Sequence, residues 1–272
     1  MSKRWAVLGV AMMASVGLTF SAATAEASSG KGADALDTVY GISQTAEGAM
    51  VTIYDAAPGV SNDELRNRLR DKGVTVLNRG ERPSAQSPVT DKQSGKSGQL
   101  VMAAVSSACQ SLRTAREWCG HRWALNGYED PAVYFLDHTS SAWPVTASTT
   151  NWNQAQGIDS YYRWYTNGCP GGGTHCVHVY NGNYGATGWV GLTSWPYDST
   201  GDFDNTTNVT IKLNDYYGGT AAQHRNTACH EMGHALGLDH NTSTGSCLYY
   251  ARTSTQYPNS DDFGILPLIY GY

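Results

Sequence analysis

The chain has 272 residues, and its 18 basic and 23 acidic side chains give a formal net charge of −5. Charged residues make up only 15%, below the roughly 25% usual for soluble domains, whereas Gly, Tyr and Trp are abundant. This charge-poor, aromatic composition is typical of secreted proteins and argues against a disordered chain. The absence of a basic surplus argues against nucleic-acid binding.

The first residues have the pattern of a secretory signal peptide. Lys3 and Arg4 precede an apolar run over 5–20, and small residues up to Ala27 offer cleavage sites. A membrane anchor is the alternative, but the run is shorter than the ~20 apolar residues that span a bilayer. We therefore expect residues 1–27 to be removed on export, with no membrane association afterwards and an extracellular location.

Residues 28–130 form a second segment of the sequence. A strand over 50–54, a capped helix over 61–72 and a strand over 74–77 predict a small α/β unit. Residues 80–99 have no aromatic side chain and are rich in Ser, Gly, Gln and Lys, which is typical of a flexible, protease-sensitive linker. We interpret this segment as a propeptide, and a permanent accessory domain is the alternative.

Residues 131–272 form the third segment, which differs from the rest in charge and in its predicted secondary structure. It carries 4 basic and 10 acidic residues, against 14 and 13 before it. Short β-like runs are separated by turn residues, at 132–136, 176–180, 188–192 and 209–213. Two longer stretches, 150–164 and 220–236, read as helices. The pattern predicts a folded domain with both strands and helices.

Six cysteines in an exported chain predict disulfide bonds. Six cysteines allow 15 pairings, so sequence alone leaves the connectivity open. Nearest-neighbour pairing is the simplest arrangement: Cys109–Cys119, Cys169–Cys176 and Cys229–Cys247. The last of these would close a loop of 18 residues and contribute about 3 kcal/mol to stability in the chain-entropy model.

The helix expected over 220–236 carries side chains with metal-ligand spacing. His230 and His234 are four residues apart, so their imidazoles lie on one helix face and can bind one ion. Glu231 lies beside them and is free not to ligate. Gly237 can adopt the left-handed conformation that ends a helix and returns His240 to the ion. Three imidazoles with an open position are typical of a catalytic zinc, and three histidines at these offsets disfavour a plain core helix.

These residues match HExxHxxGxxH, the motif of the metzincin metallopeptidases. Downstream, residues 261–263 and 269–271 resemble the start and the end of the C-terminal helix of the matrixins within that group. The resemblance covers about 131–272. It implies an α+β fold with a twisted, mostly parallel sheet, an active-site helix and a C-terminal helix. It also implies one catalytic zinc and protein or peptide substrates, and we expect a monomer.

Two positions depart from the matrixin pattern. Leu248 stands where matrixins have a methionine beneath the metal, and leucine should be tolerated because that residue supplies an apolar floor and no ligand. Tyr250 stands where matrixins usually have proline and astacin-type metzincins have tyrosine. By that similarity Tyr250 would ligate the resting metal and then hydrogen-bond the oxyanion. A place in the wall of the substrate cleft is the alternative.

Other metal ligands are less well defined by the sequence. His175 and His178 are three residues apart and would point to opposite sides of a strand, which disfavours a second zinc. Calcium would suit a group of loop carboxylates, although such groups are usually just solvated: Asp198, Asp202 and Asp204. Matrixins often mask zinc with a propeptide cysteine, which Cys119 resembles weakly. Because the cysteine count is even, a disulfide is the favoured role of Cys119.

The resemblance implies a secreted zinc-dependent endopeptidase. Zinc held by the three histidines would activate a water, and Glu231 would act as general base. A substrate would lie extended along an exposed edge strand near 188–195. Two other classes stay open. One is a secreted binding or adhesion protein with a non-catalytic zinc site, and the other is a zinc amidase acting on cell-wall peptides.

Overall fold

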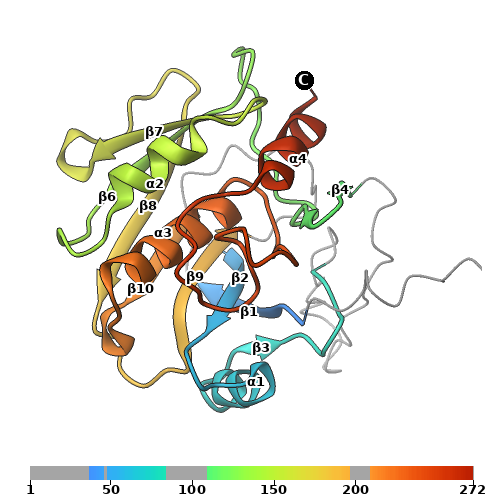
Figure 1. Ribbon diagram of the computed structural model, residues 1–272, viewed down its shortest axis with the longest axis vertical. Coiled ribbons are helices and arrows are strands. Elements are labelled where there is room, and N and C mark those ends of the chain that lie inside the picture. Colours follow the sequence, from blue (N-terminus) through green and yellow to red (C-terminus); the bar gives the residue numbers. More distant parts are fainter. Residues whose placement is uncertain (1–36, 46–47, 84–108, 197–208, 272) are drawn as a thin grey trace, which may run out of the picture. The chain divides into compact units, whose positions relative to one another are not determined.

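A computed structural model of the chain describes residues 37–45, 48–83, 109–196 and 209–271 (Figure 1). Its main element is an eight-stranded sheet in the order β3-β1-β2-β9-β10-β8-β6-β7. The strands are β1 (Val39–Thr45), β2 (Gly48–Ala56), β3 (Thr75–Val76), β6 (Ala132–Asp137), β7 (Asp159–Trp164), β8 (His175–Gly182), β9 (Trp189–Pro196) and β10 (Val209–Asn214). A second sheet consists of two short strands, β4 (Ser111–Leu112) and β5 (Ala115–Arg116).

The large sheet is mixed. Strands β7, β6, β8 and β10 are parallel neighbours, as expected for the C-terminal segment. Strand β9 is antiparallel to β10, and β2, β1 and β3 follow beyond it in further antiparallel pairs. The sheet is therefore not mostly parallel, because strands of the N-terminal segment extend it. The expectation of an exposed edge near 188–195 is wrong, since β2 pairs with the outer side of β9.

Alternating side chains decide which face of the sheet is covered. In β10, Val209, Ile211 and Leu213 are buried, whereas Lys212 on the opposite face is exposed. The helices α2 (Val145–Trp152) and α3 (Ala221–Ala235) cover the apolar face. Helix α3 contacts β9 and β10, and α2 contacts β6 and β7 (Figure 1).

The helix ends follow the capping signals of the sequence. Helix α3 begins with a capping box, in which Thr220 accepts from the Gln223 backbone and Gln223 accepts from the Thr220 backbone. Ser61 caps α1 (Asn62–Asp71), as predicted. Helix α4 (Ser260–Tyr270) begins with a second capping box at Asn259. It agrees with the C-terminal helix implied by the matrixin resemblance.

The prediction of a helix over 150–164 is wrong. Helix α2 ends at Trp152, and residues 159–164 form β7, which pairs in parallel with β6. The break lies at Gly157, whose φ of +82° belongs to the left-handed region. A Cβ at Gly157 would lie 2.8 Å from the Pro267 Cα, so the chain turns tightly against α4 there. Two 3-10 helices complete the fold, η1 (Tyr165–Asn167) and η2 (Asp215–Tyr217).

All three nearest-neighbour disulfides are present: Cys109–Cys119, Cys169–Cys176 and Cys229–Cys247. Within the described part of the chain, no helix combines the length and apolar character needed to cross a membrane. The predicted signal peptide, most of the predicted linker and the calcium candidates Asp198, Asp202 and Asp204 lie outside the described residues.

Candidate metal centre

Helix α3 and the turn after it bring the three predicted histidines together. His230 and His234 lie one turn apart on α3, and all three side chains are buried. The helix ends at Ala235 with Leu236 as its C-cap, and Gly237 follows with a φ of +90°. A Cβ there would lie 2.6 Å from the His121 carbonyl oxygen, so only glycine fits this turn. The three imidazole centroids are separated by 4.7–5.0 Å.

Hydrogen bonds fix the orientation of each imidazole. The His230 Nδ1 lies 2.8 Å from the Cys247 carbonyl oxygen, and the His234 Nδ1 lies 2.7 Å from the Leu238 carbonyl oxygen. A carbonyl oxygen only accepts, so each Nδ1 carries a proton, and each Nε2 is left as the atom that could bind a metal. The His240 Nδ1 lies 3.1 Å from the Thr38 hydroxyl, which itself donates to Asp239.

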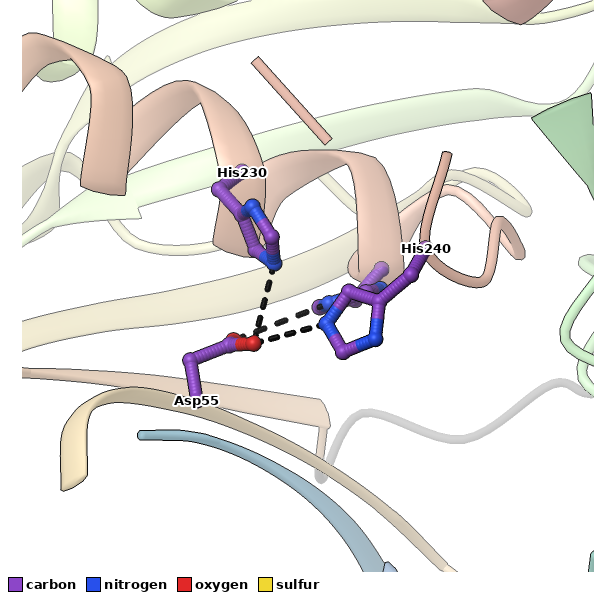
Figure 2. Close-up of side chains that lie close together, drawn as sticks. Asp55, His230 and His240 are labelled. Atoms are coloured by element: carbon purple, nitrogen blue, oxygen red, sulfur yellow. Dashed lines mark hydrogen bonds and ion pairs between the residues drawn. The ribbon is translucent and has the colours of Figure 1, made fainter. Parts of the chain in front are cut away.

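A carboxylate that the sequence analysis missed completes the group. Asp55, near the end of β2, places Oδ1 2.7 Å from the His240 Nε2 and 3.1 Å from the His230 Nε2 (Figure 2). Its Oδ2 lies 3.7 Å from the His234 Nε2. Burial opposes the charge, but the His230 and His240 imidazoles outweigh it and hold the pKa of Asp55 well below its usual value.

The alternation within β2 is the only sequence signal for Asp55. Val51, Ile53 and Asp55 share one face of the strand, and the first two are fully buried. A carboxylate on an otherwise apolar strand face needs a partner. The residues near Asp55 in the sequence do not indicate which partner this is, because the histidines lie in the C-terminal part of the chain.

The donor set suits a zinc ion. Three imidazole Nε2 atoms and one carboxylate oxygen lie within 4.8 Å of one another, and zinc favours four nitrogen, sulfur or oxygen ligands. The Nε2 atoms of His230 and His234 and the Oδ2 of Asp55 are buried, and they have no hydrogen-bond partner among the described residues. Burial also lowers the pKa of His234, which favours the neutral, metal-binding form.

Glu231 lies next to this group. Its Oε2 accepts a hydrogen bond of 2.7 Å from the Thr193 hydroxyl on β9. Its Oε1 is buried and has no partner among the described residues. A Cβ on Gly191 would lie only 2.1 Å from this Oε1, so β9 leaves space for the carboxylate by having glycine there. Burial, and then the charge of Asp55, raise the pKa of Glu231 well above its usual value.

Tyr250 lies in the wall of a small cavity beside the centre, together with Asp55, His230 and Glu231. Its side chain is 48% exposed, and its hydroxyl accepts a hydrogen bond of 2.8 Å from Tyr249. The geometry agrees with a residue of the cleft wall. Whether the Tyr250 hydroxyl binds the metal stays a prediction.

Leu248 is fully buried beneath α3. A Cβ on Gly233 would lie 2.8 Å from the Leu248 Cδ2, so helix and turn are in direct contact. The Cys229–Cys247 disulfide joins the same two segments. Leu248 therefore occupies the place expected for an apolar floor, and the carbonyl of the preceding Cys247 orients His230.

The other sequence candidates do not join the centre. The His175 ring lies 2.6 Å from the Ala124 carbonyl oxygen, whereas the His178 Nδ1 lies 2.9 Å from the His138 Nε2. Cys119 is bonded to Cys109, so it has no thiolate that could mask a metal.

A family model described as Matrixin matches residues 173–271, whereas a search of curated proteins gave no match. The matched range contains α3, the three histidines, Glu231 and α4, so residues 173–271 form a matrixin-like metzincin segment. This family implies zinc, metallopeptidase chemistry and protein or peptide substrates. Asp55 lies outside the matched range.

Proposed function

We propose that the protein is a secreted zinc-dependent endopeptidase in which Glu231 is the general base. The proposal rests on a difference in hydrogen bonding between the three histidines and Glu231. Hydrogen bonds orient the three imidazoles so that their Nε2 atoms converge, whereas the buried Oε1 of Glu231 beside them has no hydrogen-bond partner among the described residues. A purely structural metal site has no use for such a carboxylate.

The residues divide the work of hydrolysis. A bound zinc ion supplies a Lewis acid that polarises a peptide carbonyl and lowers the pKa of a water. The three histidines hold the ion. Glu231, oriented through the Thr193 hydroxyl, takes the proton of the attacking water on Oε1 and delivers it to the leaving amine. Tyr250, in the cavity wall, donates a hydrogen bond from its hydroxyl to the oxyanion.

The N-terminal part of the chain is assigned to export and latency. Residues 1–27 act as a signal peptide, and the segment up to the 80–99 linker is a pro-segment. Residues from Cys109 onward belong with the catalytic part, because their contacts support the metal centre. The Trp118 backbone N–H donates to the Gly237 carbonyl, and the Trp123 indole donates to the Ala235 carbonyl. N-terminal sequencing of secreted protein tests both boundaries, and a mature start near residue 28 would contradict the pro-segment.

The activity is tested on secreted protein from which the pro-segment has been removed. Casein, gelatin and peptidoglycan are incubated with the protein, with and without a zinc chelator. We expect chelator-sensitive cleavage of casein and gelatin. Cleavage of peptidoglycan alone would identify a cell-wall amidase.

One observation favours a second class. Asp55 closes the donor set at four protein ligands, which is the composition of a structural zinc site. A secreted binding or adhesion protein with a permanent zinc site would therefore keep residues 38–83 in its mature form. Such a protein would contain stoichiometric zinc and cleave none of the three substrates.

A further inference from the structure

Strand β2 lies along the outer side of β9 as an extended peptide. Seven residue pairs join the two strands in antiparallel register, from Met50–Pro196 to Ala56–Trp189. The inner side of β9 pairs with β10. An outer strand edge beside a hydrolytic centre is a general binding site for an extended peptide, because backbone pairing accepts any sequence. In this structure β2 occupies that edge.

The register of β2 places Asp55 at the three histidines. Asp55 lies opposite Gly191 and Ala56 lies opposite Trp189, so the register shifts there by one residue, Val190 of β9. The Asp55 side chain fills the position between the imidazole Nε2 atoms. A carboxylate therefore faces the centre where a bound peptide would have to present its scissile carbonyl, which explains how a strand can lie there uncut.

The same unit is anchored by further buried contacts. The Thr38 hydroxyl donates to Asp239 over 3.0 Å, and the Tyr40 hydroxyl donates to the other Asp239 oxygen over 2.6 Å. Val51 and Ile53 belong to the main hydrophobic core, as do these members from both sides of the contact: Tyr40, Ile42, Leu77, Trp118 and Trp195. The contact thus combines strand pairing, buried hydrogen bonds and shared apolar packing.

We propose that residues 38–83 are a built-in inhibitor that binds the β9 edge as an uncut strand, with Asp55 as fourth metal ligand. We further propose that this unit remains bound after the chain is cut between residues 84 and 108. A cut in the linker alone then leaves the centre closed, and opening it requires release or destruction of the unit itself. An inhibitory role of residues 38–83 rests on the proposed peptidase function, whereas their retention after the cut does not.

The test uses the full chain with an affinity tag placed before residue 28 of the signal-cleaved form and a specific protease site inserted between Gly95 and Lys96. The protein is loaded with zinc, cut, captured through the tag and washed. We expect the untagged C-terminal fragment to stay on the resin in about equimolar amount. Release of this fragment as soon as the chain is cut would overturn the proposal.

Two variants separate the ligand role of Asp55 from general packing. Asp55→Asn should speed the dissociation of the cut fragments at least about 10-fold, because a buried charged partner is lost. Asp71→Asn is the matched control, since Asp71 lies exposed on α1 of the same unit and should leave dissociation unchanged. Equal dissociation of the two variants would remove Asp55 from the contact.

Removal of the metal provides a second readout. A chelator should speed dissociation of the unchanged cut protein and have little further effect on Asp55→Asn. An equal chelator effect on both proteins would contradict a metal-bound Asp55. Because retention needs no substrate, retention without casein cleavage would disprove only the peptidase function. Prompt release together with casein cleavage would disprove only the retention of the unit after the cut.

Discussion

The four possible metal ligands come from two regions of the chain, and different contacts hold each region in place. The histidines come from one stretch of α3 and its turn, and backbone carbonyls of Cys247 and Leu238 orient two of them. Asp55 comes from β2 and is held by strand pairing and shared core packing. Binding of an ion would therefore depend on the local geometry of the histidines, whereas access to it would depend on β2, which belongs to the unit that we propose as an inhibitor.

The largest expected effect concerns helix α3, which carries Glu231. Glu231→Gln should lower peptidase activity by about 10²- to 10⁴-fold, because the amide cannot accept the proton of the water. Zinc content, measured on the same sample, should stay stoichiometric because Glu231 is not among the converging donors. Glu129→Gln, at an exposed position, is the control and should keep full activity. Near-normal turnover of Glu231→Gln would remove this residue from the mechanism.

The next largest effect concerns the disulfide that joins α3 to the turn beneath it. Replacing both Cys229 and Cys247 by serine should lower the free energy of unfolding by about 3 kcal/mol, because the disulfide closes a loop of 18 residues. Zinc affinity should fall as well, since Cys247 supplies the carbonyl that orients His230.

Removal of the Cys169–Cys176 disulfide is the matched control for this change. It closes a shorter loop, so a smaller loss of about 2 kcal/mol is expected in chemical denaturation. Because this disulfide lies outside the metal centre, zinc affinity should not change. A similar fall in zinc affinity for both double variants would show that general destabilisation, and not the support of His230, is responsible.

Tyr250→Phe tests whether the cavity wall takes part in the chemistry. Loss of an oxyanion donor should lower kcat by about 10²-fold with little change in KM. Tyr249→Phe removes the hydroxyl that donates to Tyr250 and should have a much smaller effect. If kcat changes less than about 3-fold in Tyr250→Phe, the residue is only part of the wall.

The smallest effect is expected where the two regions meet. Tyr40→Phe removes the donor to a buried Asp239 oxygen and should destabilise the uncut chain by about 1–3 kcal/mol. Thermal unfolding of the zinc-loaded chain measures it, and Tyr257→Phe at an exposed position serves as control. A change no larger than that of the control would show that the Asp239 contact does not hold the N-terminal unit in place.

Sequence reasoning succeeded where the determining contacts are local. The i, i+4 histidines, the glycine turn, the helix cap at Ser61 and the sequence-local disulfides all depend on residues fewer than about 20 positions apart. It failed for 150–164, because periodicity could not show that Gly157 turns tightly against Pro267. It also missed Asp55, whose partners become neighbours only through the pairing of β2 with β9.

The hydrogen bond between Thr38 and His240 has a consequence for how the protein acquires its ion. In the uncut chain the third imidazole has an acceptor for its Nδ1 proton, and a fourth ligand is already in place. Departure of residues 38–83 would take away both at once, so the precursor should have a higher zinc affinity than the mature enzyme. In the proposed secreted enzyme, metallation would then belong to maturation of the precursor and would precede release of residues 38–83.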